Sequence, residues 1–159
     1  MLHVTEVGHG DVVTFLHGFA LDGRMWEAQT AALAGSYRTL AIDLPGFGRS
    51  RYVEGHTPMT GEILSVLDAR GVERTHLVGL SLGGAVAAGF ALVHGDRLRS
   101  LVLADALLLG HPAPLQTWET VVEHARQGQR DAAIAHWLTD PVFDVARTRP
   151  AVWARIHDL

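Results

Sequence analysis

The residues with the clearest chemical potential form the segment Gly79-Leu80-Ser81-Leu82-Gly83-Gly84. A strand-like apolar run precedes it and a helical pattern follows it. A tight strand-to-helix turn of this kind lifts a serine hydroxyl out above the edge of a sheet. The flanking glycines fit such a turn, because strand and helix backbones approach closely there. The spacing therefore predicts Ser81 as the nucleophile of an acyl transfer, the alternative being a Gly/Ser turn without chemistry.

A second segment, His17-Gly18-Phe19-Ala20, directly follows the apolar run at residues 12–16. Attack of a serine on a carbonyl creates a negatively charged oxygen, and backbone N–H groups stabilise it well because their direction is fixed beforehand. The residue after the serine supplies one donor and a residue in the loop after the neighbouring strand supplies the other. We expect the N–H groups of Leu82 and Phe19 to form this oxyanion hole. His17 is expected to pack in the loop rather than to act as a general base.

Other residues with chemical potential point to structure rather than to metal or redox chemistry. The segment Asp43-Leu44-Pro45-Gly46 reads as a strand end followed by a Pro-Gly turn, which Asp43 can cap or brace. The chain has no cysteine, which excludes disulfides, thiolate metal sites and a cysteine nucleophile. Its 10 histidines show no H-E-x-x-H spacing, so we do not expect a zinc site.

The elements that must position these residues alternate along the first part of the chain. Short apolar runs, typical of strands covered on both faces, occupy residues 12–16, 39–42, 75–78 and 101–104. Residues 2–7 alternate apolar with polar, and the turn at residues 8–11 predicts a hairpin with the next strand. Helical patterns lie at residues 26–33, 59–67 and 82–93. This order predicts an α/β fold, a mostly parallel twisted sheet of about five strands with helices on both faces.

The pattern changes after residue 110, where no strand run appears and helix-like segments occupy residues 115–127, 130–138 and 150–159. The whole chain of 159 residues is globular in composition, with 48% hydrophobic and 19% charged residues. Its 13 basic against 17 acidic residues give a net charge of −4 and no basic patch, so we expect no nucleic-acid partner. The longest low-polarity stretch, residues 79–93, is too short to cross a bilayer, and nothing resembles a signal peptide. We therefore expect a cytoplasmic protein with no membrane partner.

Taken in order, several of these segments resemble the α/β-hydrolase family, most closely its cofactor-free lactonases, esterases and haloperoxidases, such as 3-oxoadipate enol-lactonases. The resemblance rests on Phe15-Leu16-His17-Gly18-Phe19, Asp43-Leu44-Pro45-Gly46-Phe47-Gly48-Arg49-Ser50, His76-Leu77-Val78-Gly79-Leu80-Ser81-Leu82-Gly83-Gly84 and Leu98-Arg99-Ser100-Leu101-Val102-Leu103-Ala104-Asp105. It implies that residues 1–110 are the N-terminal part of a hydrolase core and that residues 111–159 are the start of a helical cap. An ester or lactone is the implied substrate, with no cofactor.

The chain departs from the family pattern where the general base is expected. The family orients a histidine with an Asp or Glu, in the chain order Ser…Asp/Glu…His, usually after two further strands beyond the cap. We find no such strands in this sequence. Asp105 is a candidate acid, because it follows a strand on the same sheet edge as Ser81. The downstream histidines are not assigned as the base, since none has a predicted element that holds it over Ser81; they are His111, His124, His136 and His157.

We therefore expect a serine hydrolase that works through a Ser81 acyl-enzyme and is nearly inactive as this chain alone, because loss of a triad base costs orders of magnitude. The favoured explanation for the missing strands is that this chain is a fragment of a full hydrolase. A second explanation is a short chain that pairs with itself or with a complementary chain through the sheet edge at residues 101–104. A third is a half-size variant with a rewired site. Alternative functions are a non-catalytic binding module and a cofactor-free perhydrolase or haloperoxidase.

Overall fold

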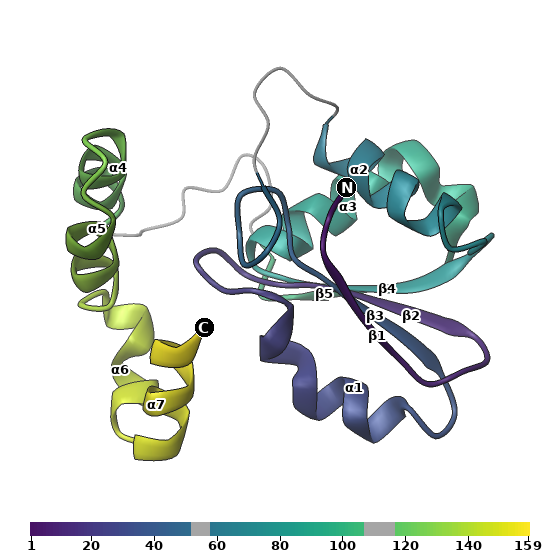
Figure 1. Cartoon of the computed structure of the whole chain (residues 1–159), viewed down its shortest axis with the longest axis horizontal. Helices are drawn as coiled ribbons and strands as arrows, with labels where there is room; N and C mark the ends of the chain where they lie inside the picture. The colour runs from purple at the N-terminus through teal and green to yellow at the C-terminus, as the bar shows by residue number, and fades with distance from the viewer. Residues whose placement is uncertain (52–57, 107–116) are drawn as a thin grey trace. The chain divides into compact units, whose positions relative to one another are not determined.

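A computed structural model describes residues 1–51, 58–106 and 117–159 (Figure 1). The chain divides into two compact units, Met1–Gly110 together with Leu159, and His111–Asp158. Within the described residues, no helix has the length and apolar character needed to cross a membrane.

The first unit is built on a five-stranded sheet with the strand order β1-β3-β2-β4-β5. Its strands are β1 Val4–Val7, β2 Val12–Leu16, β3 Arg38–Ile42, β4 Thr75–Leu80 and β5 Leu98–Ala104. The pairs β2–β3, β2–β4 and β4–β5 are parallel, and β1 is antiparallel to β3. The mostly parallel α/β sheet expected from the sequence is therefore confirmed.

The expected hairpin between β1 and the next strand is wrong. β1 pairs with β3, with Val4 opposite Ile42, and β2 lies on the far side of β3. The connection passes beside the residues that precede β3, where a side chain on Gly8 would overlap the carbonyl oxygen of Tyr37. Gly8 and Gly10 have φ values of +82° and +93°, which permit this path without strain. β3 is thereby inserted between two strands that are consecutive in the chain.

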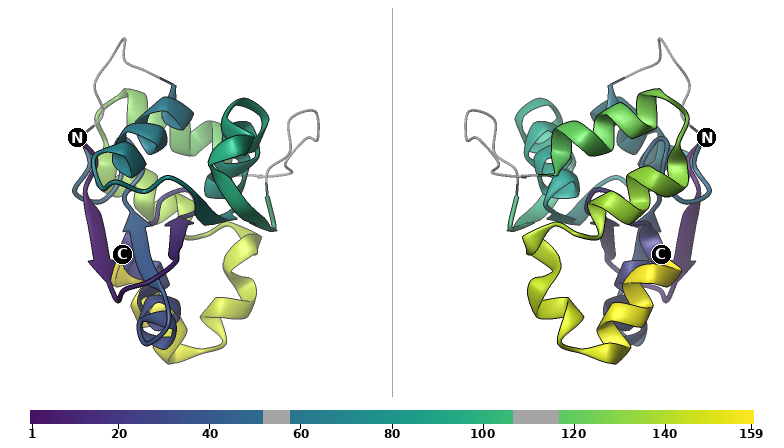
Figure 2. Two further views of the ribbon diagram at one scale, coloured as in Figure 1. Left: turned by 90° about the vertical axis from the view of Figure 1, so that its right-hand side faces the viewer. Right: turned by 90° about the vertical axis from the view of Figure 1, so that its left-hand side faces the viewer.

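Helices cover both faces of the sheet, as expected (Figures 1 and 2). The helix α1, Glu27–Leu33, lies on one face with the short 3₁₀ helix Gly23–Trp26. On that face Val13, Phe15, Trp26 and Ala41 form a buried cluster. The opposite face carries α2, Met59–Asp68, and α3, Leu82–His94, with the short 3₁₀ helix Gly95–Arg97 after α3.

The larger apolar core lies between the sheet and the helices α2 and α3. Its side chains with 0% exposure include Leu16 and Leu40 of the sheet, Ile63 of α2 and Phe90 of α3. Burial of side chains this large contributes about 1.5–3 kcal/mol each. The ends of β2 and β4, which carry the predicted chemistry, are therefore held on a rigid base.

The second unit is helical. It contains α4 Trp118–Arg126, α5 Arg130–Trp137, a 3₁₀ helix at Pro141–Phe143, α6 Asp144–Arg147 and α7 Pro150–Asp158. Val121, Ala133 and Trp137 form its buried side, and the Trp137 ring meets Phe143 edge-on at 5.5 Å. The helices expected at residues 115–127, 130–138 and 150–159 are present as α4, α5 and α7, although residues 115 and 116 lie outside the described residues. That this unit is a cap stays a prediction.

Candidate active site

Ser81 is the single residue between the end of β4 at Leu80 and the start of α3 at Leu82. Its backbone has φ +50° and ψ −111°, a conformation that residues with a side chain rarely adopt. The Ser81 N–H donates to the carbonyl of Ala104 at 3.0 Å, and the Ser81 carbonyl accepts from the N–H of Ala85 at 3.0 Å. Ser81 is half-buried rather than enclosed. The tight strand-to-helix turn predicted from the spacing is therefore present.

The glycines around Ser81 are required by the close approach of three backbone segments. A side chain on Gly79 would overlap the backbone of Gly83, and one on Gly83 would overlap the carbonyl oxygen of Leu16. A Cβ on Gly84 would lie 2.6 Å from the Cβ of Ala106. The start of α3 is thus packed directly against the end of β2, which brings the two predicted loops together.

The loop after β2 lies beside Ser81. An ideal Cβ built on Gly18 would lie 3.7 Å from the Cβ of Ser81. The Leu21 N–H donates to the Gly18 carbonyl at 3.3 Å, which closes a turn with Ala20 at φ +57°. Leu82 is the first residue of α3, where backbone N–H groups have no acceptor within the helix. The structure therefore brings the loop of Phe19 and the N–H end of α3 to the same serine, while the oxyanion hole itself stays a prediction.

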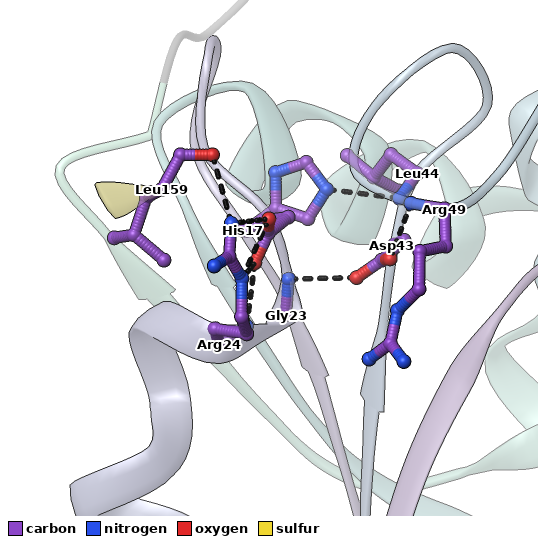
Figure 3. Close-up of polar contacts among 8 residues, drawn as sticks. His17, Gly23, Arg24, Asp43, Leu44, Arg49 and Leu159 are labelled. Carbon is purple, nitrogen blue, oxygen red and sulfur yellow. Dashed lines mark hydrogen bonds and ion pairs between the residues drawn. The ribbon is translucent and has the colours of Figure 1, made fainter. Parts of the chain in front are cut away.

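Both ring nitrogens of the buried His17 are hydrogen-bonded, and the bond to Leu44 is drawn in Figure 3. The Leu44 N–H donates to Nε2 at 2.9 Å, so Nδ1 carries the proton and donates to the Gly18 carbonyl at 2.7 Å. Burial lowers the pKa of His17 below its ordinary value of 6.5, against the raising effects of the Gly18 hydrogen bond and of Asp43 and Asp22. His17 is therefore a neutral loop residue rather than a free base, as the sequence predicted.

Asp43 braces the turn after β3, as expected. One carboxylate oxygen accepts from the Gly23 N–H at 2.8 Å and the other from the Arg49 N–H at 2.8 Å (Figure 3). The Ser50 hydroxyl donates to the Asp43 carbonyl at 2.7 Å. Because the carboxylate is buried and both of its oxygens accept hydrogen bonds from backbone N–H groups, its role in this fold is structural.

Sequence reasoning did not identify the ion pair of the buried Asp22 with the exposed Arg24. Asp22 caps the 3₁₀ helix by accepting the Arg24 N–H at 2.9 Å, and its carboxylate pairs with the guanidinium at 2.7 Å. Burial raises the pKa of Asp22, but the hydrogen bonds and charge of Arg24 lower it more, and the pKa falls below 3.8. An aspartate two residues before a helical N–H is a capping pattern, which is the signal that could have located it.

Asp105 lies on the same sheet edge as Ser81, directly after Ala104, whose carbonyl accepts the Ser81 N–H. It is exposed and has φ +46°. His111 lies outside the described residues. Within the described ranges, no hydrogen bond joins the Ser81 hydroxyl to a histidine, and no group of three or more potential metal ligands gathers.

The other downstream histidines belong to the second unit. The rings of His124 and His136 lie 6.2 Å apart, and His124 Nδ1 is 2.7 Å from Oε1 of Gln129. The His157 ring meets Trp153 edge-on at 4.8 Å. Their contacts are those of helix surface and packing residues.

Residues 11–140 match the family described as the alpha/beta hydrolase fold, and the chain belongs to this family.

Among curated proteins, the chain is 41% identical over 103 residues to the pimeloyl-[acyl-carrier protein] methyl ester esterase of Aeromonas hydrophila, a match that covers 62% of this chain and 39% of the relative. It is 36% identical over 121 residues to epoxide hydrolase 2 of Siraitia grosvenorii, with coverage of 70% and 38%. The chain thus spans about two fifths of the length of these relatives.

Among solved structures, the enol-lactonase from Burkholderia xenovorans LB400 superposes with a TM-score of 0.82 at 27% identity and covers 99% of this chain and 63% of that one. A thermophilic esterase from Thermogutta terrifontis superposes with a TM-score of 0.70 at 32% identity, with coverage of 82% and 49%. The relatives of this chain therefore include esterases, an enol-lactonase and epoxide hydrolases.

Proposed function

We propose that this chain carries the nucleophile and the oxyanion hole of a serine hydrolase that acts on a carboxylic ester or lactone. The Ser81 oxygen attacks the carbonyl carbon and gives up its proton to a base. The N–H groups of Phe19 and Leu82 bind the resulting oxyanion. The C–O bond then breaks as the base returns the proton to the leaving oxygen, which departs as an alcohol from an ester and stays attached to the acyl group from a lactone. Water finally hydrolyses the acyl-Ser81 ester. The observation that carries the proposal is the strained turn at Ser81, with φ +50°, at the start of a helix and beside Gly18.

The chemistry of a hydroxyl nucleophile favours an ester or lactone over an epoxide. Attack of Ser81 on a carbonyl gives an ester, which water cleaves with the help of the same oxyanion hole. Attack of a serine on an epoxide carbon would leave an ether, which water does not cleave readily, so the enzyme would not turn over. The epoxide hydrolases among the relatives therefore do not change the proposed substrate class.

The base is the part of this mechanism that the described residues do not supply. Asp105 is the acid we propose, because it lies on the sheet edge of Ser81. With no histidine bonded to the Ser81 hydroxyl in the described part of the chain, we expect slow turnover from this chain alone. The oxyanion hole and binding leave a residual acceleration of about 10³–10⁴ over water when a triad member is absent.

The test is hydrolysis of p-nitrophenyl acetate and of a simple lactone by the parent chain and by Ser81→Ala. Ser65→Ala is the matched control, because Ser65 lies exposed on α2. The proposal predicts slow hydrolysis that Ser81→Ala abolishes and Ser65→Ala leaves unchanged. Equal rates in the parent and Ser81→Ala, or turnover of an epoxide in place of the ester, would contradict it. Peroxide-dependent halogenation that needs Ser81 would instead indicate a perhydrolase.

A binding module is the second candidate function, and the exposed side of β5 favours it. β5 pairs only with β4 in the described sheet, and Val102 and Leu103 are 51% and 40% exposed. An unpaired edge with exposed apolar side chains favours association with a second copy or a complementary chain. Stable self-association in sedimentation, together with no Ser81-dependent hydrolysis, would support this function over the enzymatic one.

A further inference from the structure

We infer that His17 is a positioning residue, which fixes the peptide unit between Gly18 and Phe19 and thereby aims the Phe19 N–H at the carbonyl oxygen bound beside Ser81. The inference rests on the proposed function and adds to it a residue that touches neither the substrate nor the serine.

The first support is the geometry of a single peptide unit. The carbonyl of Gly18 and the N–H of Phe19 belong to the same planar group and point in opposite directions. His17 Nδ1 donates to that carbonyl at 2.7 Å, and Leu21 N–H donates to it at 3.3 Å. Holding the carbonyl oxygen therefore sets the direction of the N–H on the opposite side. A preorganised direction is what makes a backbone donor effective toward an oxyanion.

The second support is the way in which the ring itself is held. The Leu44 N–H donates to Nε2 at 2.9 Å, and the Phe47 ring packs edge-on against His17 at 5.4 Å. These residues belong to the turn after β3, which Asp43 ties to the backbone N–H groups of Gly23 and Arg49. His17 therefore links the turn after β3 to the loop that carries Phe19, and only the neutral Nδ1–H tautomer satisfies both bonds.

The surroundings of the ring keep it in that form. His17 is 0% exposed, and burial lowers its pKa more than the charges that face it raise it. Those charges are the carboxylates of Asp43 and Asp22, the latter paired with the Arg24 guanidinium. An imidazolium would direct a second N–H at the Leu44 N–H, which would break that bond.

Two substitutions by amide side chains test the two hydrogen bonds of His17 one at a time. In His17→Asn the side-chain N–H can take the place of Nδ1 and donate to Gly18, but nothing reaches Leu44. In His17→Gln the carbonyl oxygen can take the place of Nε2 and accept from Leu44, but the donor to Gly18 is lost. Each variant removes one buried hydrogen bond, so both are expected to lose stability to a similar extent.

The experiment measures Ser81-dependent hydrolysis of p-nitrophenyl acetate by these two variants, with His9→Gln as control, since His9 is exposed. We expect His17→Gln to lose about tenfold or more in kcat with little change in KM, because a misaimed oxyanion donor acts on the transition state. His17→Asn is expected to keep kcat near that of the parent despite its lower stability. Equal losses of kcat in both variants, in proportion to their stability, would overturn the inference.

A second measurement keeps the inference testable if the parent shows no Ser81-dependent rate, a result that would count against the proposed function alone. Long-range ¹H–¹⁵N spectra report which ring nitrogen of His17 carries the proton. The Nδ1–H tautomer at neutral pH supports the inference. The Nε2–H tautomer or an imidazolium would overturn it, because neither matches the two bonds that hold the peptide.

Discussion

Ser81 occupies a backbone conformation that glycine adopts far more readily than serine, with φ +50° and ψ −111°. Such a conformation costs about 1–3 kcal/mol at a residue with a side chain. The turn keeps it because the bonds to Ala104 and Ala85 and the contact of α3 with β2 fix the backbone on both sides. In this account the strain is the cost of presenting the hydroxyl beside the loop of Phe19.

Replacing Ser81 by glycine tests this strain. We expect Ser81→Gly to raise the free energy of unfolding by about 1 kcal/mol while removing the nucleophile, and Ser81→Ala to leave stability within about 0.5 kcal/mol. Urea unfolding of both variants measures the difference. Ser65→Gly, inside α2, serves as control and should cost about 0.5 kcal/mol. A clear loss of stability in Ser81→Gly would show that the turn is not strained.

At the residue scale, the strand-to-helix turn at Ser81 and the loop after β2 could be predicted, because short-range spacing defines both features. The roles of Ser81, Phe19 and Leu82 in catalysis stay predictions. The bonds from His17 to Leu44 and from Asp43 to Gly23 join residues 27 and 20 positions apart. Contacts at that separation depend on the packing of the whole sheet, so no local pattern could give them.

At the scale of elements, α3 positions the site because Gly83 in its first turn has no side chain, which lets the helix backbone contact the end of β2. Gly83 is the contact point, since a side chain there would overlap the carbonyl oxygen of Leu16 and approach that of His17 to 2.6 Å. Gly89 is in the same helix, and a Cβ there would meet only a methyl group of Thr60, at 3.5 Å. Substitutions at Gly83 therefore report on close packing, whereas substitutions at Gly89 report on helix propensity.

Alanine at these two glycines should have opposite effects. Gly83→Ala forces α3 away from β2 and is expected to cost about 1–3 kcal/mol of stability, with loss of Ser81 reactivity. Gly89→Ala adds a good helix former in ordinary contact and should stabilise by about 0.5–1 kcal/mol. Denaturant unfolding measures both. If Gly83→Ala were as stable as Gly89→Ala, the close packing of α3 on β2 would be contradicted.

The strands and helices themselves were predictable, because continuous apolar runs and helical periodicity are local properties of the chain. The pairing of β1 was not, because the turn at residues 8–11 gives no sign that β3 lies between β1 and β2. The short helices Pro141–Phe143 and α6 were also missed, since three and four residues are too few for a periodic pattern.

At the scale of the whole molecule, three buried titratable residues fix how stability responds to acid. The pKa of His17 lies below 6.5, chiefly because of burial. The pKa values of Asp22 and Asp140 lie below 3.8. For Asp140, burial raises the pKa, but hydrogen bonds from Val142 and Thr117 and the charge of Arg147 lower it more. The change in stability caused by His17 therefore occurs at higher pH than the changes caused by Asp22 and Asp140.

Stability should therefore fall in two stages on acidification. As the pH drops below 6.5, the unfolded chain binds a proton at residue 17 before the folded chain does, and stability is lost until the folded pKa is passed. The stability from Asp22 and Asp140 is present above 3.8 and is lost as the pH falls through their folded pKa values. Urea unfolding across this range measures both stages. The first stage should shrink in His17→Asn and persist in His9→Gln; an unchanged first stage in His17→Asn would contradict this assignment.

We propose that Ser81 is presented as a nucleophile beside two backbone amides, and labelling with a fluorophosphonate tests this proposal. The chain is incubated with the reagent and digested, and the modified serine is located by mass spectrometry. We expect Ser81 to be modified faster than exposed serines such as Ser65 and Ser100, and we expect Ser81→Ala to remove this reaction. Modification at equal rates among these serines, or none at Ser81, would contradict it.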